Sequence, residues 1–154
     1  MNASPLQLRN YFVSDLSLTA NREYKPKEPI QLTTEHLLVE SGFIQDKDDA
    51  RKWQVQLNIS QKAVLEANSP YLFSLEMVGF FDVLKNCPDD KVEALVKTNG
   101  PSVLYGAARE ILRALMAHGP FYPLLLPTAS FYTPDMVKKL KTKTSHAKQL
   151  QSKT

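Results

Sequence analysis

Cysteine is nearly absent from this chain of 154 residues, which contains only Cys87. A single cysteine cannot form an intramolecular disulfide, so a reducing compartment is the simplest setting for the protein. Cys87 is followed by Pro88 and has no base beside it in the sequence. We therefore expect a buried or merely tolerated thiol rather than a catalytic nucleophile.

Long apolar runs are absent as well. The longest ones, such as residues 124–126, are far shorter than the stretch of about 20 residues that a membrane-spanning helix requires. The first residues do not combine a charged region with an apolar one, which is the pattern of an export signal. Together these absences predict that the chain stays in the cytoplasm, where it is made.

Histidine is scarce and scattered. His36 lies near a predicted strand, His118 at a predicted helix end and His146 in a basic tail, so no two of them form a local pair of metal ligands. A protonated His118 would suit the carboxyl end of a helix. The acidic stretch 46–49 lacks the glycine and the distal glutamate of a calcium-binding EF-hand loop. We expect no metal site, and we interpret residues 46–49 as an exposed turn.

The remaining signals for catalysis are incomplete. Gly100 and Gly106 have the separation found in phosphate-binding loops, but Gly106 is not followed by the Lys-Ser or Lys-Thr that the motif needs. The adjacent charges Arg109 and Glu110 lie in a predicted helix, where such charges are commonly a polar stripe or an ion-pair anchor between subunits. The sequence therefore predicts a protein that is not an enzyme and that has no cofactor.

Acidic residues are missing from the end of the chain. The net charge is +3, from 19 Lys and Arg residues against 16 Asp and Glu residues. Six of the lysines lie in residues 138–154, so 13 basic residues face 16 acidic ones in the body of the protein. This segment has no arginine and no aromatic residue to stack on bases, so a solvated terminus is a simpler interpretation than contact with nucleic acid or an acidic partner. We expect one domain over residues 1–137 and a tail over residues 138–154.

Strands are predicted first and helices second, which is the order of an α+β domain. Alternating apolar residues predict one strand over residues 53–60 and another over residues 71–78. Before them we expect a first strand, a long crossover loop over residues 21–29 and a second strand over residues 30–44 that is interrupted near Gly42. The apolar face of the first strand is expected to consist of Leu6, Leu8, Phe12, Leu16 and Leu18.

Three helices are predicted after the strands. A short one spans residues 89–97, Pro101 opens a long one that Gly119 ends, and a last short one spans residues 134–140. Apolar residues cover more than half the circumference of the long helix, so it needs cover on several sides. Prolines prevent regular structure over residues 119–132, yet this segment is too apolar for an ordinary solvated loop. Something must cover it.

The long helix and the segment after it resemble the SecB family of protein-export chaperones. The resemblance rests on Ala108-Arg109-Glu110, on Gly119-Pro120-Phe121, and on residues 124–127 followed by Phe131. Two details differ, because the family usually has Phe-Pro-Tyr at residues 105–107 and an asparagine at Ser130. The resemblance implies a four-stranded antiparallel sheet packed with C-terminal helices, assembled as a dimer of dimers. Such a homotetramer would hold unfolded precursor proteins for export without using ATP.

The resemblance also implies a groove that binds unfolded polypeptide clients. Apolar side chains of the crossover loop and of the segment after the long helix would form it, namely Tyr24, Phe121, Tyr122, Leu124, Leu126, Phe131 and Tyr132. The alternative for these side chains is packing that seals the edge of the sheet, and the sequence leaves both open.

Two further sites follow from the resemblance. Subunit contact is expected along one face of the last strand, whose alternative role is ordinary core: Tyr71, Phe73, Leu75 and Met77. Asp15 and Glu76 are candidates for docking the SecA ATPase, although Thr19 and Ser74 replace acids that the family has at two other positions. A duty other than export, such as that of a toxin-antitoxin chaperone, therefore stays open. So does a nucleic-acid or ribosome adaptor that uses the basic tail.

Overall fold

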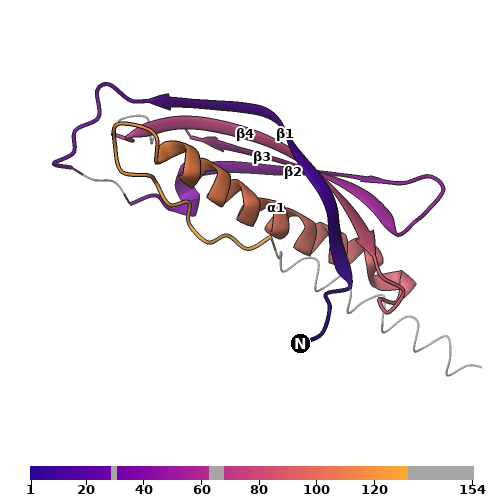
Figure 1. Ribbon diagram of the computed structural model, residues 1–154. Helices are drawn as coiled ribbons and strands as arrows, with labels where there is room; N and C mark the ends of the chain where they lie inside the picture. Colours follow the sequence, from indigo (N-terminus) through magenta and orange to yellow (C-terminus); the bar gives the residue numbers. More distant parts are fainter. Residues whose placement is uncertain (29–30, 63–67, 132–154) are drawn as a thin grey trace, which may run out of the picture.

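A computed structural model describes residues 1–28, 31–62 and 68–131. The sheet contains four antiparallel strands in the order β1-β4-β3-β2, as Figure 1 shows. Their bounds are Leu6–Ala20 for β1, Leu37–Gln45 for β2, Lys52–Gln61 for β3 and Tyr71–Val83 for β4. The helix α1 (Val92–Met116) follows the sheet, and the short 3-10 helices η1 (Thr34–His36) and η3 (Asp89–Lys91) precede β2 and α1. The predicted α+β class and four-stranded antiparallel sheet are confirmed.

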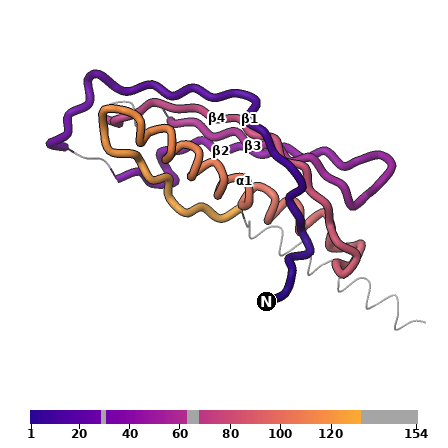
Figure 2. The backbone as a smooth tube through the Cα atoms, viewed as in Figure 1, coloured from indigo at the N-terminus to yellow at the C-terminus, as the bar shows by residue number. Residues whose placement is uncertain are grey.

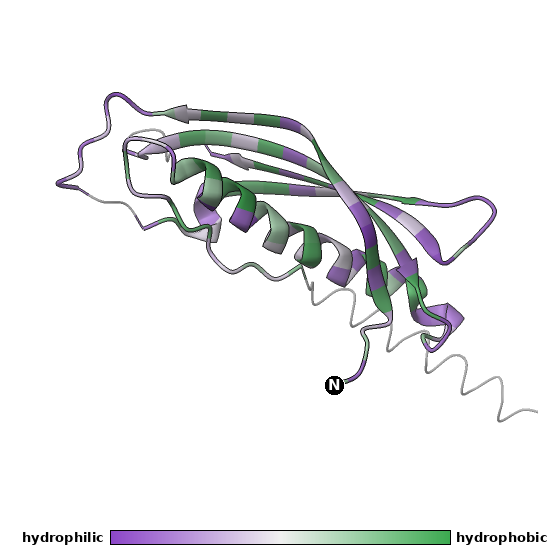
Figure 3. Cartoon of the chain, in the orientation of Figure 1, coloured by the Kyte–Doolittle hydropathy of each residue, from purple (hydrophilic) through white to green (hydrophobic). Residues whose placement is uncertain are grey.

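The helix α1 covers one face of the sheet and packs mainly on β4, with fewer contacts to β3 and β1. After α1 the chain reverses direction, and residues 119–131, which we call the strap, run back beside the helix (Figure 2). The core lies between helix and sheet, where Val55 and Leu57 of β3 cluster with Leu104 and Leu112 of α1. Hydrophobic and hydrophilic residues alternate along the strands (Figure 3), so the other face of the sheet, which we call the outer face, is more polar.

The predicted apolar face of β1 is wrong at Phe12. The register between β1 and β4 shifts around Arg9 and again around Ser14, so β1 contains two bulges. Each bulge inserts one residue and exchanges the faces that later residues occupy. Residues before the first bulge and after the second keep their predicted faces, whereas Phe12 lies on the outer face, where its ring centroid is 6.1 Å from that of Phe80.

The second predicted strand is wrong at its start. β2 begins at Leu37 and continues through Gly42 without interruption, because every residue from there to Gln45 pairs with β3. The residues before it form η1, a turn in which the Thr33 N–H donates to His36 Nδ1 at 3.1 Å. The crossover between β1 and β2 is therefore longer than predicted.

The turn between β2 and β3 is exposed, as predicted. The Asp46 carboxylate accepts hydrogen bonds from the N–H groups of Asp48 at 2.8 Å and Asp49 at 2.9 Å. These bonds favour the charged carboxylate and lower the pKa of Asp46. The acids of residues 46–49 thus shape the turn.

The predicted helix break at Pro101 is also wrong, because α1 runs through it. Proline has no N–H, so the carbonyl of Lys97 loses its usual partner one turn later. Close packing against the sheet holds this turn in place: a Cβ added to Gly100 would lie 3.0 Å from Val55. Gly100 and Pro101 are both buried, and this burial offsets the missing hydrogen bond.

Residues 132–154 lie outside the described residues, and they include Tyr132, the predicted helix over residues 134–140 and the basic tail. Within the part of the chain that the structure describes, no helix is long and apolar enough to cross a membrane. No group of three or more His, Cys, Asp or Glu side chains in residues 1–28, 31–62 and 68–131 could hold a metal ion. Cys87 is buried, as expected.

Candidate functional site

The start of the strap is anchored to the sheet by Tyr71, the first residue of β4. The Phe121 N–H donates to the Tyr71 hydroxyl oxygen at 2.9 Å. The hydroxyl in turn lies 2.8 Å from the carbonyl oxygen of Phe121 and 3.1 Å from that of Met116, so it can donate to either. Gly119 is needed beside it, because an added Cβ would lie 2.3 Å from the hydroxyl oxygen. One buried side chain thus fixes the exit of α1 and the path of Phe121.

The middle of the strap is anchored to α1. Arg109 Nε donates to the carbonyl of Leu126 at 2.9 Å, and the Tyr105 hydroxyl donates to the carbonyl of Pro127 at 2.7 Å. Burial raises the pKa of Tyr105, and the positive charge of Arg109 offsets part of this rise. Glu110 forms an ion pair with Arg113 of the same helix at 2.9 Å. The structural interpretation of Arg109 and Glu110 is therefore supported, with both partners inside this chain.

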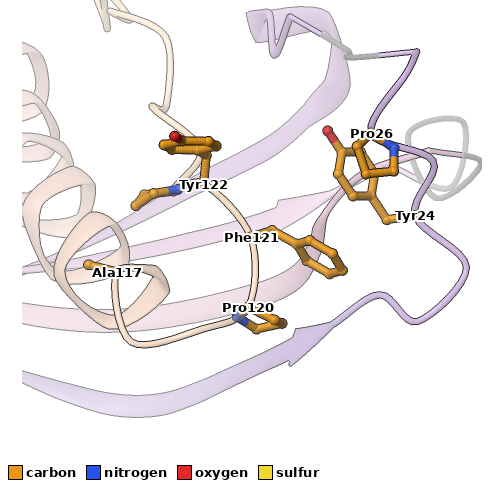
Figure 4. Close-up of a pocket in the computed structure, with 7 residues that line it drawn as sticks. Tyr24, Pro26, Ala117, Pro120, Phe121 and Tyr122 are labelled. Atoms are coloured by element: carbon orange, nitrogen blue, oxygen red, sulfur yellow. The ribbon is translucent and has the colours of Figure 1, made fainter.

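A first groove lies between the crossover loop and the start of the strap, and we call it the aromatic groove (Figure 4). Its volume is about 820 Å³, and its walls are Tyr24, Pro26, Ala117, Pro120, Phe121, Tyr122 and Pro123. The rings of Tyr24 and Phe121 meet edge to face with centroids 5.0 Å apart, and Phe121 meets Tyr71 in the same way at 5.9 Å. Tyr122 is 94% exposed. The walls carry no charged side chain, so the groove suits an apolar guest.

A second groove lies between β2 and the end of the strap, and we call it the strand-edge groove. Its volume is about 550 Å³. Leu37, Val39 and Phe43 of β2 form one wall, and Phe131 of the strap lies opposite, with its ring edge to face with Tyr105 at 5.8 Å. β2 is the last strand of the sheet, so within the described residues no further strand pairs with its outer edge beside this groove.

The predicted client-binding residues divide between three environments. Tyr24, Phe121 and Tyr122 meet in the aromatic groove, and Phe131 lines the strand-edge groove. Leu124 is half-buried and packs against the core. Leu126 has no exposed surface, because its side chain fills the core where Arg109 holds the strap, so the prediction that it contacts clients is wrong.

Much of both grooves was not predicted from the sequence. The prolines that form walls beside the aromatic rings were not identified, although their position in an apolar loop was the available signal. The β2 wall was not identified either, because no faces were assigned to the predicted second strand. The alternation of Leu37, Val39, Ser41 and Phe43 would have revealed that wall.

The predicted subunit contact on β4 corresponds to core. Tyr71, Phe73, Leu75 and Met77 are all at most 5% exposed and belong to the cluster beneath α1. α1 of the same chain covers them in this structure. The alternative of ordinary core, which the sequence left open, is the one that the structure supports.

Asp15 and Glu76 lie opposite each other on neighbouring strands, on the outer face. The same line across the sheet continues through Asn58 of β3 to Glu40 of β2. We call these four residues the acidic row. The Ser14 hydroxyl donates to Glu76 Oε1 at 2.9 Å, which orients that carboxylate. Two members of the row, Asp15 and Glu76, were predicted from the sequence. Asn58 and Glu40 were not, because the sequence does not give the register between neighbouring strands.

Apolar side chains are also exposed beside α1, away from the grooves. Tyr11, Val13 and Leu16 of β1 and Val103 and Leu115 of α1 are each between 37% and 42% exposed. β1 is the other edge strand of the sheet. Exposed apolar side chains next to an open edge are typical of a surface that a partner covers.

Comparison with known proteins gives one consistent result. The family model of the preprotein translocase subunit SecB matches residues 1–134. The protein-export protein SecB of Psychrobacter arcticus is 26% identical over 132 residues, covering 82% of each chain. That of an Azoarcus species is 27% identical over 139 residues, covering 84% of this chain and 85% of the relative.

A solved structure has the same fold. It is the SecB-like chaperone Rv1957 of Mycobacterium tuberculosis, in complex with a ChAD peptide from the HigA1 antitoxin. The two chains are 19% identical, and the match covers 82% of this chain and 91% of the other with a TM-score of 0.59. The sheet, the helix and the family match over residues 1–134 lead to one assignment. The chain belongs to the SecB family of protein-export chaperones.

Proposed function

We propose that this chain holds unfolded precursor proteins in the cytoplasm and keeps them competent for export without using ATP. The observation that carries the proposal is the strap, whose backbone is anchored to the core while its aromatic side chains line two open grooves. Tyr122 in particular extends into solvent, although a large aromatic residue gains free energy from burial.

The grooves favour unfolded proteins because of what such proteins expose. Burial of one client Leu or Phe side chain contributes about 1.5 to 3 kcal/mol and needs no defined sequence. Folded proteins hide these side chains, so the grooves select non-native chains. Binding only the unfolded state then delays folding by mass action.

Assembly into a homotetramer would strengthen the binding. Tyr11 and Leu16 of β1 and Val103 and Leu115 of α1 are exposed apolar side chains of the kind that a second copy can cover. Equivalent grooves on four subunits would raise the effective concentration of binding sites along one extended client. The proposed subunit contact therefore lies on β1 and α1 instead of on the buried face of β4.

The acidic row is the proposed docking site for the SecA ATPase. Asp15, Glu76 and Glu40 bring three carboxylates to one line of the outer face. Charges at the rim of an interface chiefly steer docking. A double Asp15→Lys and Glu76→Lys variant should therefore lose SecA affinity and keep its clients. Absence of SecA binding in the unmodified protein would remove the export role and leave a holding chaperone.

A toxin-antitoxin chaperone is the second candidate. Two observations favour it: Thr19 and Ser74 are neutral where the family has acids that dock SecA, and the fold matches a SecB-like chaperone bound to an antitoxin peptide. This candidate uses the same grooves with a different client. Binding of an antitoxin segment in preference to export precursors would distinguish it.

Suppression of aggregation without ATP tests the proposal. A reduced, unfolded model protein should stay soluble when the chain is present in stoichiometric amounts. The effect should persist or increase in high salt, because apolar burial is not screened. An effect that disappears with salt would indicate charge-driven binding through the basic tail instead.

A further inference from the structure

The strap side of the aromatic groove offers few backbone hydrogen-bond donors. Pro120 and Pro123 have no N–H group. Of the two residues between them, Phe121 already donates its N–H to the Tyr71 hydroxyl at 2.9 Å. A client segment lying along this wall would find only the Tyr122 N–H in the stretch from Pro120 to Pro123.

The opposite wall, formed by the crossover loop, also offers few free backbone N–H donors. The Tyr24 N–H donates to the carbonyl of Asn21 at 3.2 Å, and the Lys25 N–H donates to Asn68 Oδ1 at 2.8 Å. Pro26, which follows, has no N–H. Figure 4 shows Tyr24 and Pro26 on one side of the groove and Pro120, Phe121 and Tyr122 on the other. Neither wall can form a β-ladder with a guest.

The strand-edge groove differs in this respect. There β2 is an edge strand, and within the described residues no further strand pairs with its outer side, so a guest could be added as a further strand. In the aromatic groove the N–H groups of Phe121, Tyr24 and Lys25 are already used, so most carbonyl groups of the guest must stay hydrogen-bonded to water. Recognition then rests mainly on side chains and on single contacts such as a tyrosine hydroxyl.

The polyproline II conformation meets these requirements. Its backbone is extended, has no internal hydrogen bonds and is fully solvated. A proline-containing segment adopts it before binding, so less conformational entropy is lost on docking. Grooves lined by aromatic rings recognise such segments in other proteins. The rings of Tyr24, Phe121 and Tyr122 and the uncharged walls provide a surface of this kind.

We propose that the aromatic groove selects client segments that contain proline next to apolar residues and that bind in the polyproline II conformation. This inference rests on the proposed holding function and names the class of segment that this groove takes. Segments with β-forming residues and no proline are assigned to the strand-edge groove.

Affinity for matched peptides tests the inference. The probes are a short uncharged peptide that alternates leucine and proline, and the same peptide with every proline replaced by alanine. The full-length protein should bind the alanine peptide about fivefold more weakly, which corresponds to about 1 kcal/mol. Equal or tighter binding of the alanine peptide would overturn the inference. If a reduced, unfolded protein still binds in that case, the holding function stands without the proline preference.

Two variants test whether the preference for the proline peptide arises in the aromatic groove. Tyr122→Ser should abolish the difference between the peptides, because Tyr122 lines the groove. Leu125→Ser is the matched control, since Leu125 is an exposed apolar residue of the same strap that does not line the groove. A difference that persists in Tyr122→Ser, or that is lost equally in Leu125→Ser, would overturn the assignment to this groove.

Discussion

Tyr71 joins the sheet to the end of α1 and to the strap through a single hydroxyl group. Its place in an alternating strand was readable from the sequence, and the structure confirms the strand. Its hydroxyl, however, contacts the end of α1 at Met116 and the strap at Phe121, which are 45 and 50 residues away. No local pattern encodes that contact. The same holds for Arg109, whose partner is a backbone carbonyl of the strap.

Replacement of Tyr71 by phenylalanine should separate anchoring from packing. Tyr71→Phe keeps the ring but removes the partner of the Phe121 N–H, so the free energy of unfolding should fall by about 1 to 3 kcal/mol. Client affinity should fall as well, because Phe121 loses its anchor in the groove wall. Urea denaturation and a client titration measure the two effects.

Tyr122→Phe is the control for this variant. The Tyr122 side chain is almost fully exposed, so loss of its hydroxyl should leave stability within about 0.5 kcal/mol of the unmodified protein. If Tyr71→Phe is as stable as this control, the hydroxyl does not hold the strap.

At the scale of elements, the sequence predicted strands better where their register is regular. β3 was predicted correctly to within one residue at each end, and β4 starts at the predicted residue but continues to Val83, beyond the predicted end at residue 78. β1 was predicted at the right place in the chain, but Phe12, between its two bulges, was given the wrong face of the sheet. The bulges at Arg9 and Ser14 leave no clear signal in the residue types. The two predicted helices proved to be one, because burial of the turn at Pro101 outweighs the local preference of proline to end a helix.

Replacement by alanine should change the free energy of unfolding in opposite directions at two glycines, Gly106 and Gly119. Gly106 lies within α1 with no atom within 4 Å of an added Cβ. Gly106→Ala should therefore raise the free energy of unfolding by about 0.5 to 1 kcal/mol. Gly119→Ala would push against the Tyr71 hydroxyl and should lower it by about 1 to 3 kcal/mol.

Thermal or urea unfolding of the two glycine variants measures the difference. A stable Gly119→Ala variant would mean that the strap can exit α1 along another path. In that case the close approach to Tyr71 would not determine the position of the groove.

At the scale of the whole molecule, α1 is the α-helix that packs on the sheet within the described residues, and it does not cover all four strands. It packs mainly on β4, with fewer contacts to β3 and β1, and apolar residues of β1 stay exposed on the same side. The grooves arise for the same reason, since the strap and the crossover loop close only part of the remaining space. The proposed assembly and the proposed client binding would both follow from this incomplete cover.

A charged substitution should have different effects at an exposed residue of β1 and at a core residue of β4. Leu16→Asp, at an exposed position of β1, should dissociate the proposed tetramer while the subunit stays folded. Leu75→Asp should unfold the subunit, because it buries a charge in the core. Sedimentation and circular dichroism distinguish the outcomes. A monomeric unmodified protein at micromolar concentration would contradict the shared-groove mechanism.

The measurement that tests the central claim most directly is client affinity and melting temperature on the same two variants, Tyr122→Ser and Leu125→Ser. Both residues are exposed on the strap, but only Tyr122 lines the aromatic groove. We expect Tyr122→Ser to bind a reduced, unfolded protein at least about fivefold more weakly with an unchanged melting temperature, and Leu125→Ser to bind normally. Unchanged affinity in a stable Tyr122→Ser variant would contradict the account.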